Sequence, residues 1–175
     1  KEYNQAVRTY VLPSTVETIG ELAFGYANIT DLYIPEGVRT IESMAVFKGQ
    51  LANLYTYRYD SPVIETTYSA VSSLKEIYPS FPDGLESIGS DAFSYNRGLT
   101  FVYIPSSVTS IGHHAFWDTV YKEDGELRGV KEIYIQASKD EFHSVDTGDQ
   151  WRPKYDYLLF TKSVDLVYSS ERASV

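Results

Sequence analysis

One short pattern recurs about five times along this chain, and a tyrosine occupies the same place in every copy. A fixed period of this length predicts a solenoid, in which each copy buries an apolar face against its neighbours. Stacked repeats form long open binding surfaces rather than closed pockets, which argues against an enzyme. The tyrosine-containing segments are 29–35, 51–57, 74–80, 99–105 and 130–136. An isoleucine returns at steps of 22, 23, 24 and 23 residues, at Ile19, Ile41, Ile64, Ile88 and Ile111.

Nearly every column of the repeat is apolar or small, as burial against a neighbouring copy requires. The third copy fits least well, and a proline in it removes a donor from its strand. We therefore expect residues 57–73 to be irregular. The poorly fitting residues of this copy are Ser61, Tyr68, Ser69 and Pro79. The column predicted to face the core from consecutive strands of one parallel sheet contains Leu32, Leu54, Ile77, Val102 and Ile133.

Three copies contain the same nine-residue pattern. Val16–Phe24 reads Val-Glu-Thr-Ile-Gly-Glu-Leu-Ala-Phe, and Leu85–Phe93 and Val108–Phe116 follow it. This pattern, with Leu-x-x-Ile-x-Ile-Pro before it, resembles the BspA-like leucine-rich repeat family over about residues 10–136. The resemblance implies an α/β fold: a right-handed leucine-rich repeat solenoid with one parallel sheet, short helical turns on the other side and a C-terminal cap. The usual interior cysteine of this family is absent, and its place is taken by Ala27, Gly49, Ser72, Asn96 and Thr119.

The pattern predicts one domain in two parts. Residues 1–136 contain the repeats, about five, and a lead-in strand at 10–13. Residues 137–175 depart from the pattern, and we expect them to cap the core at the end of the stack. In this segment Ser138–Glu141 is a capping box, which predicts the start of a helix, and a last strand is expected at 164–168.

The composition argues against several classes of function. With 15 basic and 24 acidic residues the net charge is −9, which disfavours binding to nucleic acid or to an anionic membrane. No apolar run approaches the length of a membrane span, so we expect no membrane insertion. No hydrophobic signal segment is present near Lys1, and we expect a mature chain or an excised fragment. The absence of cysteine excludes disulfides, zinc–thiolate sites and thiol catalysis.

Few residues suggest chemistry, and none forms a catalytic motif. We expect His113, His114 and His143 at the surface, because they lie at variable positions of the repeat or beside the capping box. The acidic residues of a polar insert at 117–129, and those at 146–149, lack the spacing of an EF-hand loop. This favours solvated loops over a calcium site. We expect no enzyme activity, no cofactor and no metal.

The tyrosines form the strongest candidate surface. Side chains alternate between the two faces of a strand, so Tyr33 points outward if Leu32 points inward. Two interpretations of the outward column remain open: a stacked ladder that stabilises the sheet, or a binding surface, since tyrosine offers a large area and a polar tip. Tyr57 either belongs to this surface or packs in a loop. The candidate ligand-binding residues are Tyr33, Tyr55, Tyr57, Tyr78, Tyr103, Tyr134, Asp31, Glu76 and Glu132.

The resemblance implies an extracellular or cell-surface location, because members of the family are found mainly on bacterial surfaces and several are linked to adhesion. A recognition or adhesion module would bind a host or surface protein, or a glycan, as a monomer or as part of a longer chain. The alternative is a structural spacer or targeting arm attached to an enzymatic or wall-anchoring domain. Ligand screening distinguishes the two hypotheses, since the fold alone does not establish a function.

Overall fold

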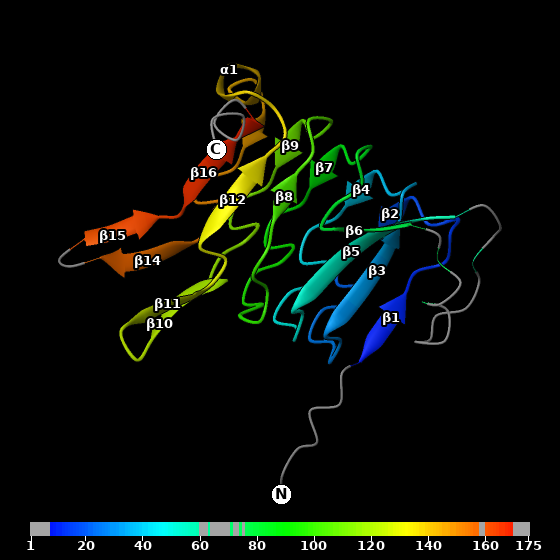
Figure 1. Ribbon diagram of the computed structural model, residues 1–175, viewed down its shortest axis with the longest axis horizontal. Coiled ribbons are helices and arrows are strands. Elements are labelled where there is room, and N and C mark those ends of the chain that lie inside the picture. The colour runs from blue at the N-terminus through cyan, green and yellow to red at the C-terminus, as the bar shows by residue number, and fades with distance from the viewer. Residues whose placement is uncertain are drawn as a thin grey trace, which may run out of the picture.

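The computed structural model describes residues 8–59, 63, 71, 74, 76–157 and 160–169. These residues form a repeating fold made mostly of strands, with α1 (Lys139–Phe142) as the one α-helix among them. Figure 1 shows strands of successive copies side by side, from β1 (Thr9–Val11) toward one end to β16 (Asp165–Tyr168) toward the other. Equivalent segments of neighbouring copies pair in parallel, and this pairing places two series of strands along the stack.

The first three strands of one series follow the predicted period. Tyr10 lies opposite Leu32, and Leu32 lies opposite Leu54, in parallel register. Leu32 and Leu54 are buried, as expected for the inward column. The lead-in strand is therefore confirmed as the first member of the sheet. These strands are β1 (Thr9–Val11), β3 (Asp31–Pro35) and β5 (Asn53–Arg58).

The second series contains the repeated isoleucines, which are buried at Ile19, Ile41, Ile88 and Ile111. Here β4 pairs directly with β7, so Ile41 lies opposite Ile88. The copy predicted around Ile64 therefore does not stand between them. The strands, in sheet order, are β2 (Thr18–Ile19), β4 (Thr40–Ile41), β7 (Ser87–Ile88), β9 (Ser110–Ile111) and β13 (Asp146–Thr147).

Most of the third copy lies outside the described residues. Within the predicted irregular segment 57–73, the structure describes residues 57–59, Val63 and Val71. The irregularity predicted there stays a prediction for the remaining positions. The notable residues that lie outside the description are Ser61, Ile64, Tyr68 and Ser69.

The tyrosine-bearing strands form two sheets instead of the single parallel sheet that the sequence predicts. After β5 the chain adds β6 (Glu76–Pro79) in antiparallel register, and Ile77 is 42% exposed. Val102 and Ile133 are buried, as predicted. The second sheet has the order β16–β12–β8, with all pairs parallel. Its strands are β8 (Tyr103–Ile104), β12 (Glu132–Ile135) and β16 (Asp165–Tyr168).

The prediction for Ile77 fails because the tyrosine-containing segment 74–80 is shifted by two residues relative to the isoleucine that follows it. Leu32 and Ile34 precede the next repeated isoleucine, Ile41, by nine and seven residues, and the same spacing before Ile88 falls on Pro79 and Phe81. Phe81 is buried at 4% and takes the inward place that Ile34 has in its copy. The motif at 74–78 imitates a repeat strand but lies outside that register.

Turns rather than helices follow the isoleucine strands, so the prediction of short helical turns is wrong. Two residues in each of the four turns that the structure describes have a positive φ, which interrupts a right-handed helix. Backbone N–H groups in these turns donate to the next copy: Phe24 to the Ala45 carbonyl at 2.8 Å and Tyr26 to the Phe47 carbonyl at 2.7 Å. The positive-φ residues are Leu22, Tyr26, Met44, Lys48, Asp91, Tyr95, His114 and Asp118.

The end of the chain continues both series. Strand β13 pairs in parallel with β9, and strand β16 pairs in parallel with β12. The predicted capping box is confirmed, with the Ser138 hydroxyl and the Glu141 carboxylate bonded to each other's backbone N–H at the start of α1 (Lys139–Phe142). The predicted last strand is confirmed as β16. Two hairpins complete the chain: β10 (Val120–Glu123) with β11 (Glu126–Gly129), and β14 (Lys154–Tyr157) with β15 (Phe160–Ser163).

A buried asparagine replaces the missing interior cysteine in one copy. The Asn96 side-chain amide donates to the Val46 carbonyl at 2.6 Å, and its oxygen accepts the Leu51 N–H at 3.1 Å. Gly49 stands at the same place in an earlier copy, where a Cβ would lie 2.9 Å from the Asn96 oxygen. A glycine in one copy thus makes room for a hydrogen-bonding side chain in another.

We expect Asn96→Ala to lower the free energy of unfolding by about 1–3 kcal/mol, because it leaves buried backbone groups without partners. Chemical denaturation measures this change. Arg97→Ala is the matched control, since Arg97 pairs with Asp118 at the surface and exposed ion pairs contribute about 0–1 kcal/mol. An equal loss in both variants would contradict the role assigned to Asn96.

Candidate functional site

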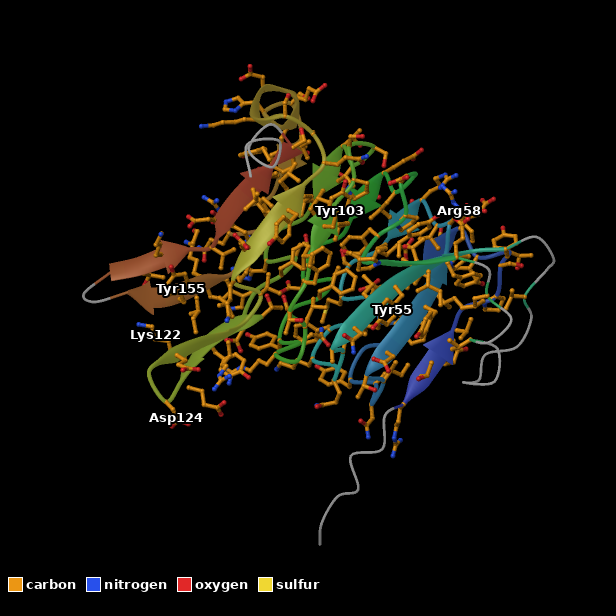
Figure 2. The ribbon with its side chains drawn as sticks, in the orientation of Figure 1. Tyr55, Arg58, Tyr103, Lys122, Asp124 and Tyr155 are labelled. Carbon is orange, nitrogen blue, oxygen red and sulfur yellow. The ribbon has the colours of Figure 1, made fainter. Side chains whose placement is uncertain are left out.

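The predicted outward column is present on the first sheet. Tyr33 and Tyr55 are register partners, and their rings stack with centroids 4.9 Å apart. Beside them the Asn53 amide donates to an Asp31 carboxylate oxygen at 2.7 Å. Both tyrosines are half-buried, so part of each ring faces solvent. Figure 2 shows Tyr55 on β5, Arg58 at the end of that strand, and Tyr103 on the other sheet.

The column continues on the second sheet, where Tyr103 and Tyr134 are register partners. Phe101 stacks on Tyr134 with ring centroids 5.4 Å apart, and Phe101 is 38% exposed. The Tyr134 hydroxyl donates to a Glu132 carboxylate oxygen at 2.7 Å. The predicted acidic flank therefore also holds the ring of its neighbouring tyrosine in place.

Tyr78 does not join this column, so the prediction of five aligned tyrosines is wrong. Antiparallel pairing places Tyr78 opposite Thr56, which is itself the register partner of inward-facing Ile34. Residues opposite each other in a ladder share a face. Tyr78 therefore lies on the other face of its sheet from Tyr33 and Tyr55, and the reversed direction of β6 is the cause.

Tyr78 belongs instead to a cluster of charged side chains with Glu76. Its hydroxyl donates to a Glu76 carboxylate oxygen. This hydrogen bond raises the pKa of the Tyr78 phenol, because the carboxylate favours the protonated hydroxyl. The Arg58 guanidinium lies over the ring, 5.3 Å from its centroid, and forms ion pairs with Glu36 at 3.2 Å and Glu76 at 3.5 Å.

Tyr57 is fully buried, so its assignment to the ligand-binding surface is wrong. Together with Val11 and Val63 it forms a small second core, against which Val71 and Leu74 pack. This core lies on the outer face of β1, β3 and β5, because Tyr33 packs against it while Leu32 packs in the main core. The third copy thus covers part of the face that the sequence predicts to be open.

Burial also fixes the chemistry of Tyr57. Its hydroxyl donates to the Leu12 carbonyl at 2.5 Å, and burial raises the pKa of the phenol. A folded-state pKa above the unfolded value means that this contribution to stability is present below the ordinary tyrosine pKa of about 10 and is lost as pH rises above it.

We expect Tyr57→Phe to lower the free energy of unfolding by about 1 kcal/mol near neutral pH, because it removes a buried hydrogen bond. Urea unfolding followed over a series of alkaline pH values should show a smaller loss of stability in Tyr57→Phe than in the parent chain. Tyr26→Phe is the control, since Tyr26 is 66% exposed. The same alkaline loss in the parent chain and in Tyr57→Phe would contradict this assignment.

A groove that the sequence did not predict lies where the two tyrosine-bearing sheets part. Its volume is about 790 Å³. Its existence follows from the reversal of β6, because no parallel strand fills the place between β5 and β8. The residues that line it are Glu36, Gly37, Arg39, Thr56, Arg58, Tyr59, Tyr78, Pro79, Phe81, Pro82, Asp83, Gly84, Phe101 and Tyr103.

Ser80 joins the two sheets at this break. Its backbone N–H donates to the Leu54 carbonyl at 2.7 Å, while its hydroxyl oxygen accepts the Tyr103 N–H at 3.0 Å and lies 3.3 Å from the Tyr103 carbonyl. Ser80 is 1% exposed and has a φ of 72°, a conformation that costs energy for residues other than glycine. One side chain thus replaces the missing strand.

We expect Ser80→Ala to lower the free energy of unfolding by about 1–3 kcal/mol, because it removes the buried Ser80 hydroxyl and its hydrogen bond from the Tyr103 N–H. Ser80→Gly should cost less, since glycine adopts a positive φ without penalty. Thermal and urea unfolding measure both. Exposed Ser106, changed to alanine, is the control. If Ser80→Ala were as stable as the control variant, the hydrogen bond between Ser80 and Tyr103 would not contribute to stability.

The other candidate residues are dispersed. His113 and His143 are exposed as predicted, whereas His114 is half-buried between the rings of His113 and Trp117. The polar insert is not an irregular loop: it forms the hairpin β10–β11, whose tight turn holds Asp124 in Figure 2. Among the described residues, no three His, Asp or Glu side chains are grouped so as to hold a metal ion.

Comparison with known proteins agrees with this geometry. Residues 3–122 match the BspA type leucine-rich repeat region in six copies, one more than the sequence pattern predicts. The protein is a leucine-rich repeat protein. Because the match spans more than half of the chain, it belongs to the BspA type family. No curated protein matches the sequence.

One solved structure shows a similarity. It is a leucine rich cell surface protein from Faecalibacterium prausnitzii A2-165, with 24% sequence identity and a TM-score of 0.47. The alignment covers 79% of this chain and 35% of that protein, so the present chain corresponds to about a third of its length. In the part of the present chain that the structure describes, no helix has the length and apolar character needed to cross a membrane.

Proposed function

We propose that this chain is a non-catalytic recognition module of a secreted or cell-surface protein, which binds a host or surface protein or a glycan. The observation that carries the proposal is the outward aromatic column, where Tyr33 stacks on Tyr55 and Phe101 stacks on Tyr134 with partly exposed rings. Membership in the BspA type family supports a surface repeat module.

The chemistry of this face favours a particular kind of partner. Rings that are already stacked lose little side-chain freedom on binding, so their exposed area is available to apolar side chains or sugar rings. The acidic groups of Asp31 and Glu132 are held in place by Asn53 and Tyr134. Together with the net charge of −9, they favour a neutral or basic ligand over an anionic one.

The proposal includes an architecture. The copies stack as a right-handed solenoid forming one domain, residues 1–136 supply the recognition face, and residues 137–175 cap the core. Support for the cap comes from β13 and β16, which extend both strand series beyond the last copy. The module acts as a monomer or as part of a longer chain.

A second function, that of a structural spacer or targeting arm, is favoured by a different observation. Val63, Val71 and Leu74 cover part of the outer face of the first sheet together with Tyr57. A face that is covered by the chain itself stabilises the fold without binding anything. Binding at the exposed half of the column, around Phe101 and Tyr134, would distinguish a recognition module from a spacer.

The test is an array of host-matrix proteins and glycans, followed by Tyr55→Ala and Tyr134→Ala on any ligand found. Each variant should weaken binding by about 2 kcal/mol if its ring lies at the centre of the interface. Tyr26→Ala is the control, because Tyr26 is exposed on a turn and does not belong to the outward column. Unchanged affinity in both folded variants, or no ligand at all, would favour the spacer.

A further inference from the structure

The groove between the two tyrosine-bearing sheets has the size and lining of a ligand site. Its volume of about 790 Å³ falls within the range of small-molecule sites, about 300–1,000 Å³. Two exposed rings line it, Tyr78 from β6 and Phe101 from the segment before β8, and both are 38% exposed. Ser80 holds these two segments at a fixed separation.

Two arginines of this groove are restrained by their surroundings. Arg58 is paired with Glu36 and Glu76 and lies over the Tyr78 ring. Arg39 donates from Nη1 to the Glu36 carbonyl at 3.0 Å and lies so close to Gly84 that a Cβ there would be 2.1 Å from this nitrogen. Planar donors held in this way lose little freedom when they bind a ligand.

The charges of the lining balance. Arg39 and Arg58 are matched by Glu36 and Asp83 within the groove, and Glu76 adds a further negative charge beside Arg58. The whole chain carries a net charge of −9. This distribution offers both donors and acceptors to hydroxyl groups, and it provides no excess of positive charge to attract a polyanion.

Main-chain recognition of a peptide strand is disfavoured here. A peptide that extends a sheet needs free backbone donors and acceptors at a strand edge. At β8 the Tyr103 N–H is already bonded to the Ser80 hydroxyl, and in β6 Pro79 has no N–H to donate. The groove presents aromatic rings and planar polar side chains. Groups of these two kinds bind sugars, because rings stack on C–H faces and polar groups bond to hydroxyls.

We propose that the groove binds an uncharged oligosaccharide, with Tyr78 and Phe101 as stacking surfaces and with Arg39, Arg58 and Asp83 bonded to its hydroxyls. The proposal rests on the proposed role as a recognition module, and it places the ligand in the groove rather than on Tyr33 and Tyr55 of the outward column; Phe101 borders both. A sugar ring has apolar C–H faces for the aromatic rings and peripheral hydroxyls for the charged side chains.

The test is an NMR titration of the folded chain with uncharged hexasaccharides of glucose, mannose, xylose, galactose and N-acetylglucosamine. Hexagalacturonate and a decaproline peptide serve as an anionic and a peptide probe. We expect an uncharged member to bind with a Kd of about 1 mM or tighter and to shift the amide signals of residues 78–84 and 101–103. Tyr78→Leu and Phe101→Leu should each weaken this binding about tenfold or more.

Matched variants separate stacking from loss of the fold. Tyr78→Phe keeps the ring and should retain most of the affinity, although it loses the hydrogen bond to Glu76. Tyr95→Leu should leave binding unchanged, because Tyr95 is 39% exposed but lies outside the groove. Amide spectra of each variant report whether it is folded.

Three outcomes overturn the groove proposal. The first is that none of the uncharged hexasaccharides binds. The second is that only hexagalacturonate or decaproline binds at the groove, which changes the ligand class but keeps a recognition module. The third is a loss of oligosaccharide binding with Tyr55→Ala but not with Tyr78→Leu, because Tyr55 belongs to the outward column alone and Tyr78 to the groove alone. In that case the outward column is the site, and the proposed function survives without the groove.

Discussion

The structure depends on backbone hydrogen bonds that each copy makes to the next. The N–H groups of Gly89, Gly112 and Gly148 donate to the carbonyls of the isoleucines in the preceding copies, each at 2.7 Å. A Cβ at any of these glycines would lie within 2.4 Å of a neighbouring backbone nitrogen, so the copies approach as closely as glycine allows. Because the main chain is the contact, equivalent residues must stay in register, and the side-chain columns follow from that register.

This constraint explains which features the sequence could predict. The inward column at Leu32, Leu54, Val102 and Ile133, the lead-in strand and the capping box at Ser138 all follow from spacing or local hydrogen bonding. The reversal of β6 does not, because residues 74–78 imitate the strand motif. The better guide is the distance to the following isoleucine, which places Phe81 in the column.

The candidate site was harder to predict than the fold, because side-chain direction depends on the neighbours of a strand. Alternation correctly places Tyr33 and Tyr55 on the outer face, but it cannot show that Val63, Val71 and Leu74 return to cover Tyr57. The groove has no sequence signature, since it is the gap left by a strand that runs in the other direction. The turns deviate from the predicted helices because residues such as Leu22 and Met44 adopt a positive φ, for which their residue type gives no signal.

The single serine between the two tyrosine-bearing sheets gives the stack unequal stiffness. On one side of the stack the second series of strands pairs without interruption from β2 to β13. Bending the stack on that side must therefore distort a continuous ladder of backbone hydrogen bonds. On the other side the Ser80 hydroxyl bonds β8 to the preceding copy, and no ladder of paired strands joins the two sheets in the described part of the chain. We therefore expect a load applied across the stack to bend it at the Ser80 junction before it distorts the ladder from β2 to β13.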